Sequence, residues 1–139
     1  MKKLFIILPI LLCENVVMGE NMKIQINNTD YDVVIDDSQI ANEIFNELPE
    51  EMQLSEFANH EYVGNLDFTP MSPEDQTSIL DAGHIYYWAP GNAFVINYAE
   101  YDISPYESVH IGEFVDKTVC DILQNSDDVI TIHIVKGDE

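Results

Sequence analysis

The sequence contains no arginine, and its positive charge is limited to five lysines against 26 aspartates and glutamates. The formal net charge is −21 at pH 7 with neutral histidines. Duplex nucleic acid and anionic lipid surfaces would repel such a chain, so we expect neither as a partner. Disorder is the usual alternative for an acidic chain, but apolar residues are frequent and regularly spaced here. This pattern indicates a folded domain with a solvated acidic exterior.

Long apolar runs are also absent. The run Leu4–Leu12 is less than half as long as the roughly 20 residues that a bilayer-spanning helix needs. It follows two lysines and precedes Gly19, which is the layout of a secretory signal peptide. We predict a signal peptide over residues 1–19 and an exported mature domain, periplasmic or extracellular, over residues 20–139, with no membrane insertion after cleavage. Cleavage removes two lysines and one glutamate, so the formal charge changes from −21 to −22.

Cysteine is scarce, with only Cys13 and Cys120 in the chain. Cys13 leaves a lipoprotein as an alternative, because a lipoprotein signal ends at an acylated cysteine. That cut prefers a small residue before the cysteine, and Leu12 stands there, so we favour plain cleavage. Only Cys120 then remains, which excludes an internal disulfide and leaves the fold to be held by its core alone. Its apolar neighbours Val119 and Ile122 predict a buried, inert thiol.

Short segments of strand-like sequence dominate the mature part, which reads as one domain. They cover residues 22–27, 31–35, 52–57, 62–68, 79–80, 84–88, 93–98, 108–114 and 129–135, with residues 69–78 and 99–106 expected as loops. Two helices are expected besides. The first is capped by Asp37 or Ser38 and stopped by Pro49, and the second is capped by Asp116 with Val119, Ile122 and Leu123 facing inward. These elements predict a mainly β fold, a closed antiparallel barrel of about eight strands with two short capping helices.

An aromatic hairpin occupies residues 83–98, GHIYYWAPGNAFVINY, with a turn at residues 89–92. Both faces of its second arm are largely apolar, which indicates that one face fills the barrel and the other is covered. Aromatic side chains with polar tips serve well at partly buried contact surfaces. We therefore take as candidate ligand-binding residues Tyr86, Trp88, Tyr98, His84 and His110, the two histidines being able to meet across neighbouring strands. The alternative is that most of these aromatic residues only pack the barrel.

The order of these features resembles a known family. The chain is similar to the small bacterial cyclophilin-like proteins in three segments. These are Leu48-Pro49 after the first helix, Ala82-Gly83-His84-Ile85 and Tyr87-Trp88 before Pro90-Gly91-Asn92, and the later His110-Ile111-Gly112-Glu113-Phe114. The resemblance covers nearly all of residues 22–135. It implies an eight-stranded barrel capped by two helices, in a family whose biochemical role is largely undefined. His84 departs from the pattern, because the family usually carries an acid at that position.

The resemblance raises prolyl isomerisation as a possible activity. Cyclophilins use an arginine to donate a hydrogen bond toward the prolyl nitrogen as amide resonance is lost. This chain has no arginine, and lysine is a poor substitute for a planar guanidinium. We therefore expect no catalytic residue of this kind and favour a non-catalytic module that binds a peptide or a small molecule. A divergent isomerase or another enzyme on the same fold is the alternative, and the oligomeric state is left open.

Metal and nucleophile motifs are incomplete. His60-Glu61 begins like the zinc motif HExxH, but Gly64 stands where the second histidine should be. The stretch from Asn28 begins like a calcium loop but lacks its glycine and its final glutamate. No G-x-S-x-G occurs. The sequence therefore predicts no metal and no cofactor, and leaves a divalent ion held by His84 and His110 as an alternative.

Overall fold

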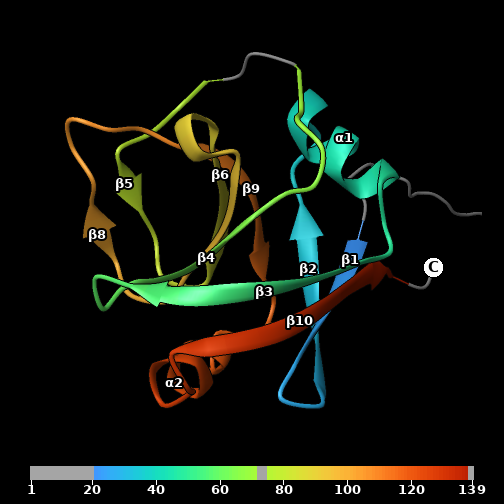
Figure 1. Ribbon diagram of the computed structural model, residues 1–139, viewed down its shortest axis with the longest axis vertical. Helices are drawn as coiled ribbons and strands as arrows, with labels where there is room; N and C mark the ends of the chain where they lie inside the picture. The colour runs from blue at the N-terminus through green and yellow to red at the C-terminus, as the bar shows by residue number, and fades with distance from the viewer. Residues whose placement is uncertain (1–20, 72–74, 138–139) are drawn as a thin grey trace, which may run out of the picture.

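The computed structural model describes residues 21–71 and 75–137, in which ten strands are found. Eight of them form a closed antiparallel barrel in the order β1-β10-β3-β4-β7-β6-β9-β2, and β2 pairs with β1 to seal it (Figure 1). The predicted signal peptide and Cys13 lie outside the described residues. The barrel strands are β1 (Asn21–Ile26), β2 (Thr29–Ile35), β3 (Glu50–Phe57), β4 (Glu61–Asn65), β6 (His84–Trp88), β7 (Ala93–Asn97), β9 (Val109–Phe114) and β10 (Val129–Lys136).

Alternation along the strands builds the core of the barrel, as the sequence predicted. In β10 Ile130, Ile132 and Ile134 face inward, while Thr131 and His133 face solvent. The inward residues of β1 and β10 are Met22, Ile24, Ile26, Ile130, Ile132 and Ile134. Phe94 and Ile96 of β7 join the same cluster from the opposite wall. The interior is thus filled by side chains, which is what an eight-stranded barrel of this size requires.

Helix α1 (Gln39–Asn46) begins where a serine can cap it. Oγ of Ser38 accepts a hydrogen bond from the backbone N of Ala41 at 3.2 Å. Ile40, Ala41 and Ile44 are buried and belong to the barrel core. The helix therefore covers the barrel through the apolar stripe that the sequence predicted.

Helix α2 (Val119–Gln124) is short, and two predictions about it need correction. Its cap position is Thr118 rather than Asp116, although Oδ1 of Asp116 accepts hydrogen bonds from the backbone N and Oγ1 of Thr118 at 3.0 and 2.7 Å. Val119 and Leu123 are buried as predicted, but Ile122 is 39% exposed. A helix of this length buries only the narrow stripe of residues four apart, and Ile122 lies beside that stripe. In the view of Figure 1, α1 and α2 lie at opposite ends of the molecule.

A second, two-stranded sheet lies outside the barrel. It pairs β5 (Ile79–Leu80) with β8 (Tyr101–Asp102), and β8 falls in a segment that the sequence predicted as loop. Leu80 packs with Tyr86, Ala93 and Val95 in a separate buried cluster. The outer face of the hairpin is therefore covered, as its apolar character predicted. We call β5 and β8 together the outer sheet.

Candidate functional site

A β-bulge determines which way His110 points. In the pairing of β6 with β9, Ile85 lies opposite Gly112 whereas Tyr86 lies opposite His110, so Ile111 is an extra residue. An extra residue inverts the alternation of the strand beyond it. Ile111 is fully buried in the core, and His110 therefore faces outward on the same side as Glu113. A Cβ at Gly112 would lie 2.6 Å from the carbonyl oxygen of Val34, so only glycine allows β2 to approach here.

The bulge brings His84, His110 and Asp36 into one hydrogen-bonded row. Nδ1 of His84 lies 2.8 Å from Nε2 of His110, and Nδ1 of His110 lies 2.6 Å from Oδ2 of Asp36. Asp36 directly follows β2, and its backbone N donates to the carbonyl oxygen of Ile111 at 2.7 Å. The two histidines therefore meet as the sequence analysis expected. Sequence reasoning missed Asp36, because nothing local marks it as a partner of a residue in a distant strand.

Two charged groups complete this site. Oε1 of Glu113 lies 4.0 Å from Nε2 of His84, and Oε2 of Glu113 accepts a hydrogen bond from Nζ of Lys117 at 2.9 Å. The hydrogen bond from Lys117 holds the pKa of Glu113 below its usual value. Burial lowers the pKa of His84, because desolvation disfavours the imidazolium. His84 is therefore a neutral base at pH 7 beside an ionised carboxylate.

Tyr86 lies beneath this row and packs against it. It is 1% exposed, and its ring edge packs against His110 with centroids 5.3 Å apart and planes at 80°. Its hydroxyl accepts a hydrogen bond from the backbone N of Asp81 at 2.8 Å. Burial raises the pKa of Tyr86 to about 12, so the phenol stays neutral. Its contacts with His110 make it a packing residue for the histidine pair.

Trp88 lies at the other end of the same outward face of β6. It is partly buried against the second hydrophobic cluster, and Tyr106 meets its ring edge-on with centroids 6.1 Å apart and planes at 84°. Tyr106 is 60% exposed. Ile79 and Tyr101 of the outer sheet are also exposed, by 42% and 46%. Sequence reasoning missed Tyr106, which lies in a loop where no pattern indicates its neighbour.

Tyr98 lies apart from the other four candidates. It is 8% exposed and belongs to the barrel core, with its ring 5.8 Å from that of Tyr62. Its hydroxyl donates to Oε2 of Glu56 at 2.8 Å. Burial raises the pKa of Tyr98, so it too is neutral. The structure therefore brings together His84, His110 and Tyr86. It places Trp88 farther along β6 and Tyr98 in the barrel core.

A second polar cluster is buried between β4 and the outer sheet. Nδ1 of His60 lies 2.8 Å from Oδ1 of Asn97, and the His60 ring stacks on Tyr101 of β8 with centroids 4.0 Å apart. The amide nitrogen of Asn97 donates to the carbonyl oxygens of Leu80, Asp81 and Ala99 at 2.9 to 3.1 Å. Asn97 and His60 thus fasten the outer sheet to the barrel. His60 does not belong to a metal-binding group. Among residues 21–71 and 75–137 no three His, Cys, Asp or Glu side chains are grouped to hold an ion.

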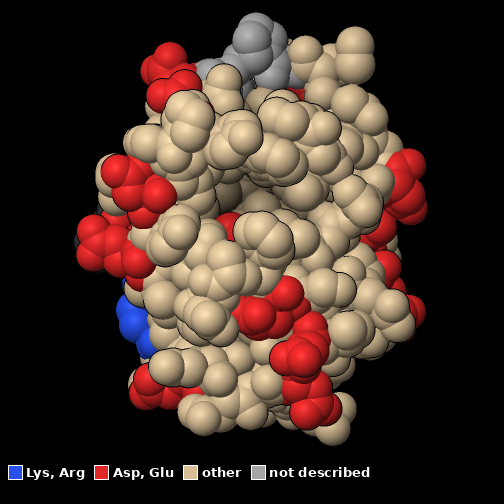
Figure 2. All heavy atoms as spheres, turned by 60° about the vertical axis from the view of Figure 1, so that its left-hand side comes forward, with Lys and Arg blue, Asp and Glu red and all other residues tan. Residues whose placement is uncertain are grey.

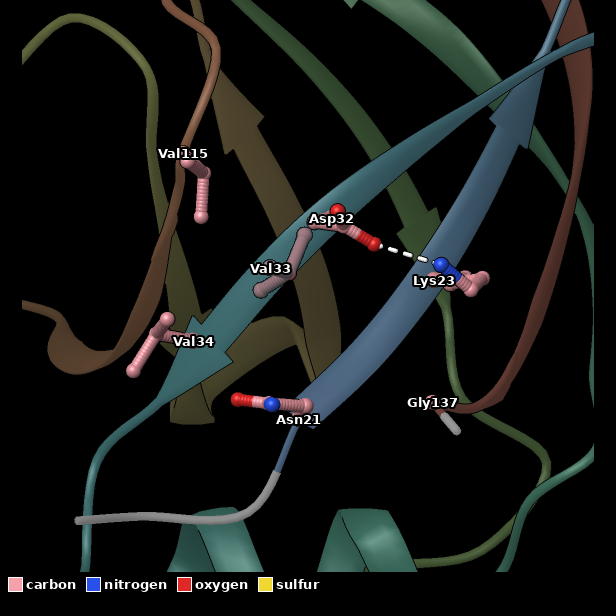
Figure 3. Close-up of a pocket in the computed structure, with 7 residues that line it drawn as sticks. All are labelled: Asn21, Lys23, Asp32, Val33, Val34, Val115 and Gly137. Atoms are coloured by element: carbon pink, nitrogen blue, oxygen red, sulfur yellow. Dashed lines mark hydrogen bonds and ion pairs between the residues drawn. The ribbon is translucent and has the colours of Figure 1, made fainter. Parts of the chain in front are cut away.

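Two open depressions lie away from all of these residues. One, of about 230 Å³, lies over β1 and β2 and is crossed by the ion pair between Lys23 and Asp32 at 2.6 Å (Figure 3). The other, of about 420 Å³, lies beside α2 and includes Ile122. Neither depression contains a candidate side chain, and both are open to solvent. Within the same described ranges, no helix is long and apolar enough to cross a membrane.

Structural comparison finds the same fold elsewhere. The solution structure of the hypothetical protein AF2241 from Archaeoglobus fulgidus matches with a TM-score of 0.68 at 14% identity, over 90% of this chain and 100% of that one. The structure of McbB in complex with tryptophan matches with a TM-score of 0.59 at 10% identity, over 85% of this chain and 45% of McbB. No curated protein matches the sequence. The model of the cyclophilin-like family matches residues 24–135, and the chain therefore belongs to the cyclophilin-like family.

Proposed function

We propose that the protein is an exported binding module that holds a short uncharged or basic peptide against Trp88 and Tyr106. The observation that carries this proposal is the edge-on pair itself, in which a partly buried indole is braced by a phenol that is 60% exposed. Tryptophan and tyrosine are the residues most enriched where partners contribute binding energy. A ligand side chain placed against this pair would remove both rings from water without any change in the fold.

The surroundings of the pair favour an uncharged or basic ligand. Figure 2 shows the face on the side of the outer sheet, with a broad area of uncharged side chains and acidic side chains around and below it. The exposed apolar residues Ile79 and Tyr101 belong to the outer sheet. With a net charge of −21, the chain repels anions at long range and attracts cations. A basic peptide should therefore associate faster than an acidic one, and the difference should shrink with added salt.

Prolyl isomerisation is not part of the proposal, because the chain has no arginine. A coupled assay on a proline-containing tetrapeptide should give no turnover above the uncatalysed rate, and clear turnover would overturn this exclusion. The solved complex of McbB with tryptophan is an example of small-molecule binding by a protein that contains this fold. At 10% identity it shows the fold, and it places no ligand on the residues of this chain.

Binding can be followed directly, because Trp88 is the only tryptophan in the chain. Ala-Phe-Lys-Ala with an acetylated N-terminus and an amidated C-terminus is titrated while the indole emission is recorded. Ala-Phe-Glu-Ala with the same end groups is the charge-reversed comparison. We expect saturable binding of the lysine peptide and weaker binding of the glutamate peptide. Tyr106→Ala should weaken binding at least about fivefold, which corresponds to about 1 kcal/mol.

The matched control is Phe57→Ala, because Phe57 is equally exposed, at 61%, but lies on β3. This variant should bind the lysine peptide like the unsubstituted protein. Calorimetry replaces fluorescence for Trp88→Leu, which removes the chromophore. If the lysine peptide binds but neither Tyr106→Ala nor Trp88→Leu changes its affinity, the site lies elsewhere. If neither peptide binds at millimolar concentration, peptide binding at this surface is refuted.

Export is tested on the expressed full chain. We expect the protein recovered outside the cytoplasm to begin at residue 20, which N-terminal sequencing and intact mass would show. A mass increase of a diacylglyceryl group on a chain beginning at Cys13 would indicate the lipoprotein alternative. An intact chain that begins at Met1 and stays in the cytoplasm would refute export.

A further inference from the structure

With both histidines neutral, the Asp36 carboxylate sets where the protons of the row Asp36, His110 and His84 lie. The Asp36 carboxylate can only accept, so Nδ1 of His110 donates to it over 2.6 Å. In the neutral imidazole the other nitrogen is then an acceptor, so Nε2 of His110 accepts from Nδ1 of His84 over 2.8 Å. Nε2 of His84 is left with its lone pair. The side chain of His84 that carries this lone pair is 19% exposed.

Glu113 lies next to that lone pair at a separation that suits a bridge. Its Oε1 is 4.0 Å from Nε2 of His84, too far for a direct hydrogen bond. A water oxygen about 2.8 Å from each atom fits between them. Lys117 holds the other carboxylate oxygen at 2.9 Å, which keeps Glu113 in place. A water in this position could donate one proton to each of the two acceptors.

We propose that His84 is a general base that activates this water for the hydrolysis of a neutral carboxylic ester, with Asp36 and His110 as positioning residues. The water oxygen forms a bond to the acyl carbon while its proton passes to Nε2 of His84. The bond from the acyl carbon to the alcohol oxygen then breaks, and the departing alkoxide takes that proton. His84 returns to its neutral form, so no oxidant, reductant or metal enters the balance.

The row stabilises the charged intermediate of this step. When Nε2 of His84 gains a proton, the imidazolium keeps its hydrogen bond to His110 and faces Glu113. The row then reads carboxylate, imidazole, imidazolium, carboxylate, so each of the two N–H groups of the imidazolium faces an acceptor. A neutral ester is the expected substrate class, because the chain's charge of −21 disfavours an anionic one. The inference concerns a different group of residues from Trp88 and Tyr106 and stands independently of peptide binding.

The probe is p-nitrophenyl acetate, followed over multiple turnovers so that acylation of Cys120 or a lysine does not count. The matched control is His133, which is also paired with a glutamate, Nε2 to Oε2 of Glu51 at 3.9 Å, but whose side chain is 50% exposed on β10, outside this row. We expect His84→Gln to lower the second-order rate at least roughly tenfold, at the lower edge of what a positioned general base contributes. His133→Gln should leave it unchanged. Equal rates for these two variants would overturn the proposal.

The positioning role has its own readout. The rate should rise with pH as His84 loses its proton, in a field set by Asp81, Glu113, Lys117 and His110. Asp36→Asn and His110→Gln should shift the midpoint of this profile as well as lower its plateau, whereas a merely structural role would lower the plateau alone.

A spectroscopic test needs no variant, in case a substitution prevents folding. Nitrogen-15 shifts of the unsubstituted protein at pH 8 should show His84 protonated at Nδ1 and bare at Nε2. The opposite tautomer would also overturn the proposal.

Discussion

Glu61 should make the protein lose stability as the pH rises through neutrality. Its side chain is 13% exposed, and its pKa is raised to about 7, mainly by burial and then by the charge of Glu56. His60 does not offset this, although its Nδ1 is 3.5 Å from Oε1 of Glu61. Since the amide nitrogen of Asn97 donates to three carbonyl groups, its oxygen accepts the Nδ1 proton of His60 instead.

The sign follows from where the proton is held. The pKa of Glu61 is about 7 in the folded state against a usual value of 4.5, so the folded state keeps a proton that the unfolded chain has released. The contribution to stability is complete below pH 4.5 and is lost as the pH rises through 7. At about 1.4 kcal/mol per pKa unit the loss has a ceiling of about 3.5 kcal/mol. Because the carboxyl retains some contact with solvent, screening reduces the expected loss to about 2 kcal/mol.

Urea unfolding of the unsubstituted protein and of Glu61→Gln at pH 5 and pH 8.5 measures this loss. We subtract the free energy of unfolding of the unsubstituted protein from that of Glu61→Gln at each pH. This difference should be about 2 kcal/mol larger at pH 8.5 than at pH 5. Taking the difference between variants cancels the repulsion among the other acids. Glu107→Gln is the control, because Glu107 is exposed and its substitution removes the same kind of charge without touching a buried carboxyl, so no such gain is expected. If Glu61→Gln and the unsubstituted protein lose stability in parallel, the burial argument is wrong.

Three further substitutions test the fold that holds the candidate site. Gly112→Ala should cost about 1 to 3 kcal/mol in urea unfolding, because its Cβ would meet the carbonyl of Val34 at 2.6 Å, and amide shifts should move at His110; unchanged stability would contradict the close approach. Tyr62→Phe should cost about 1 to 2 kcal/mol, since its hydroxyl donates to the carbonyl oxygens of Leu123 and Asp127 at 3.1 and 2.7 Å and so joins α2 to the barrel; a smaller change would mean that water replaces it. Phe94→Ala should cost about 3 to 5 kcal/mol because Phe94 is fully buried, and a melting temperature equal to that of Phe57→Ala would refute its place in the core.

Local pattern was sufficient for the barrel. Alternation in β10 identified the buried Ile130, Ile132 and Ile134, and the two apolar faces of β7 indicated both a filled interior and a covered exterior. These signals depend only on neighbours in sequence. Strand β8 has two residues, which is too short for alternation to register, so its segment was predicted as loop. It is recognised only through its pairing with β5.

The partners within the candidate site depend on long-range contacts. Asp36 and His110 are 74 positions apart, and Trp88 meets Tyr106 across a proline-containing loop. No residue near Asp36 or Tyr106 marks either as a site residue. Tyr86 and Tyr98 were predicted as ligand-binding from their residue type, and that role remains a prediction, with both side chains found at 8% exposure or less. Residue type alone does not distinguish an aromatic wall from aromatic packing.

The histidine pair depends on the bulge, which is why sequence alone could place the two histidines on neighbouring strands but not on one face. In a regular strand, alternation from Glu113 would turn His110 into the barrel, where its polar ring would lack a partner. The extra residue Ile111 reverses that alternation, and Gly112 allows β2 to come close enough for Asp36 to reach His110. Deletion of Ile111 should therefore leave His110 on the outward face beside His84, because the shortened strand alternates regularly from Glu113 through Gly112 to His110. Loss of the hydrogen-bonded Nδ1 signal of His84 in a deletion variant that still folds would contradict this alternation.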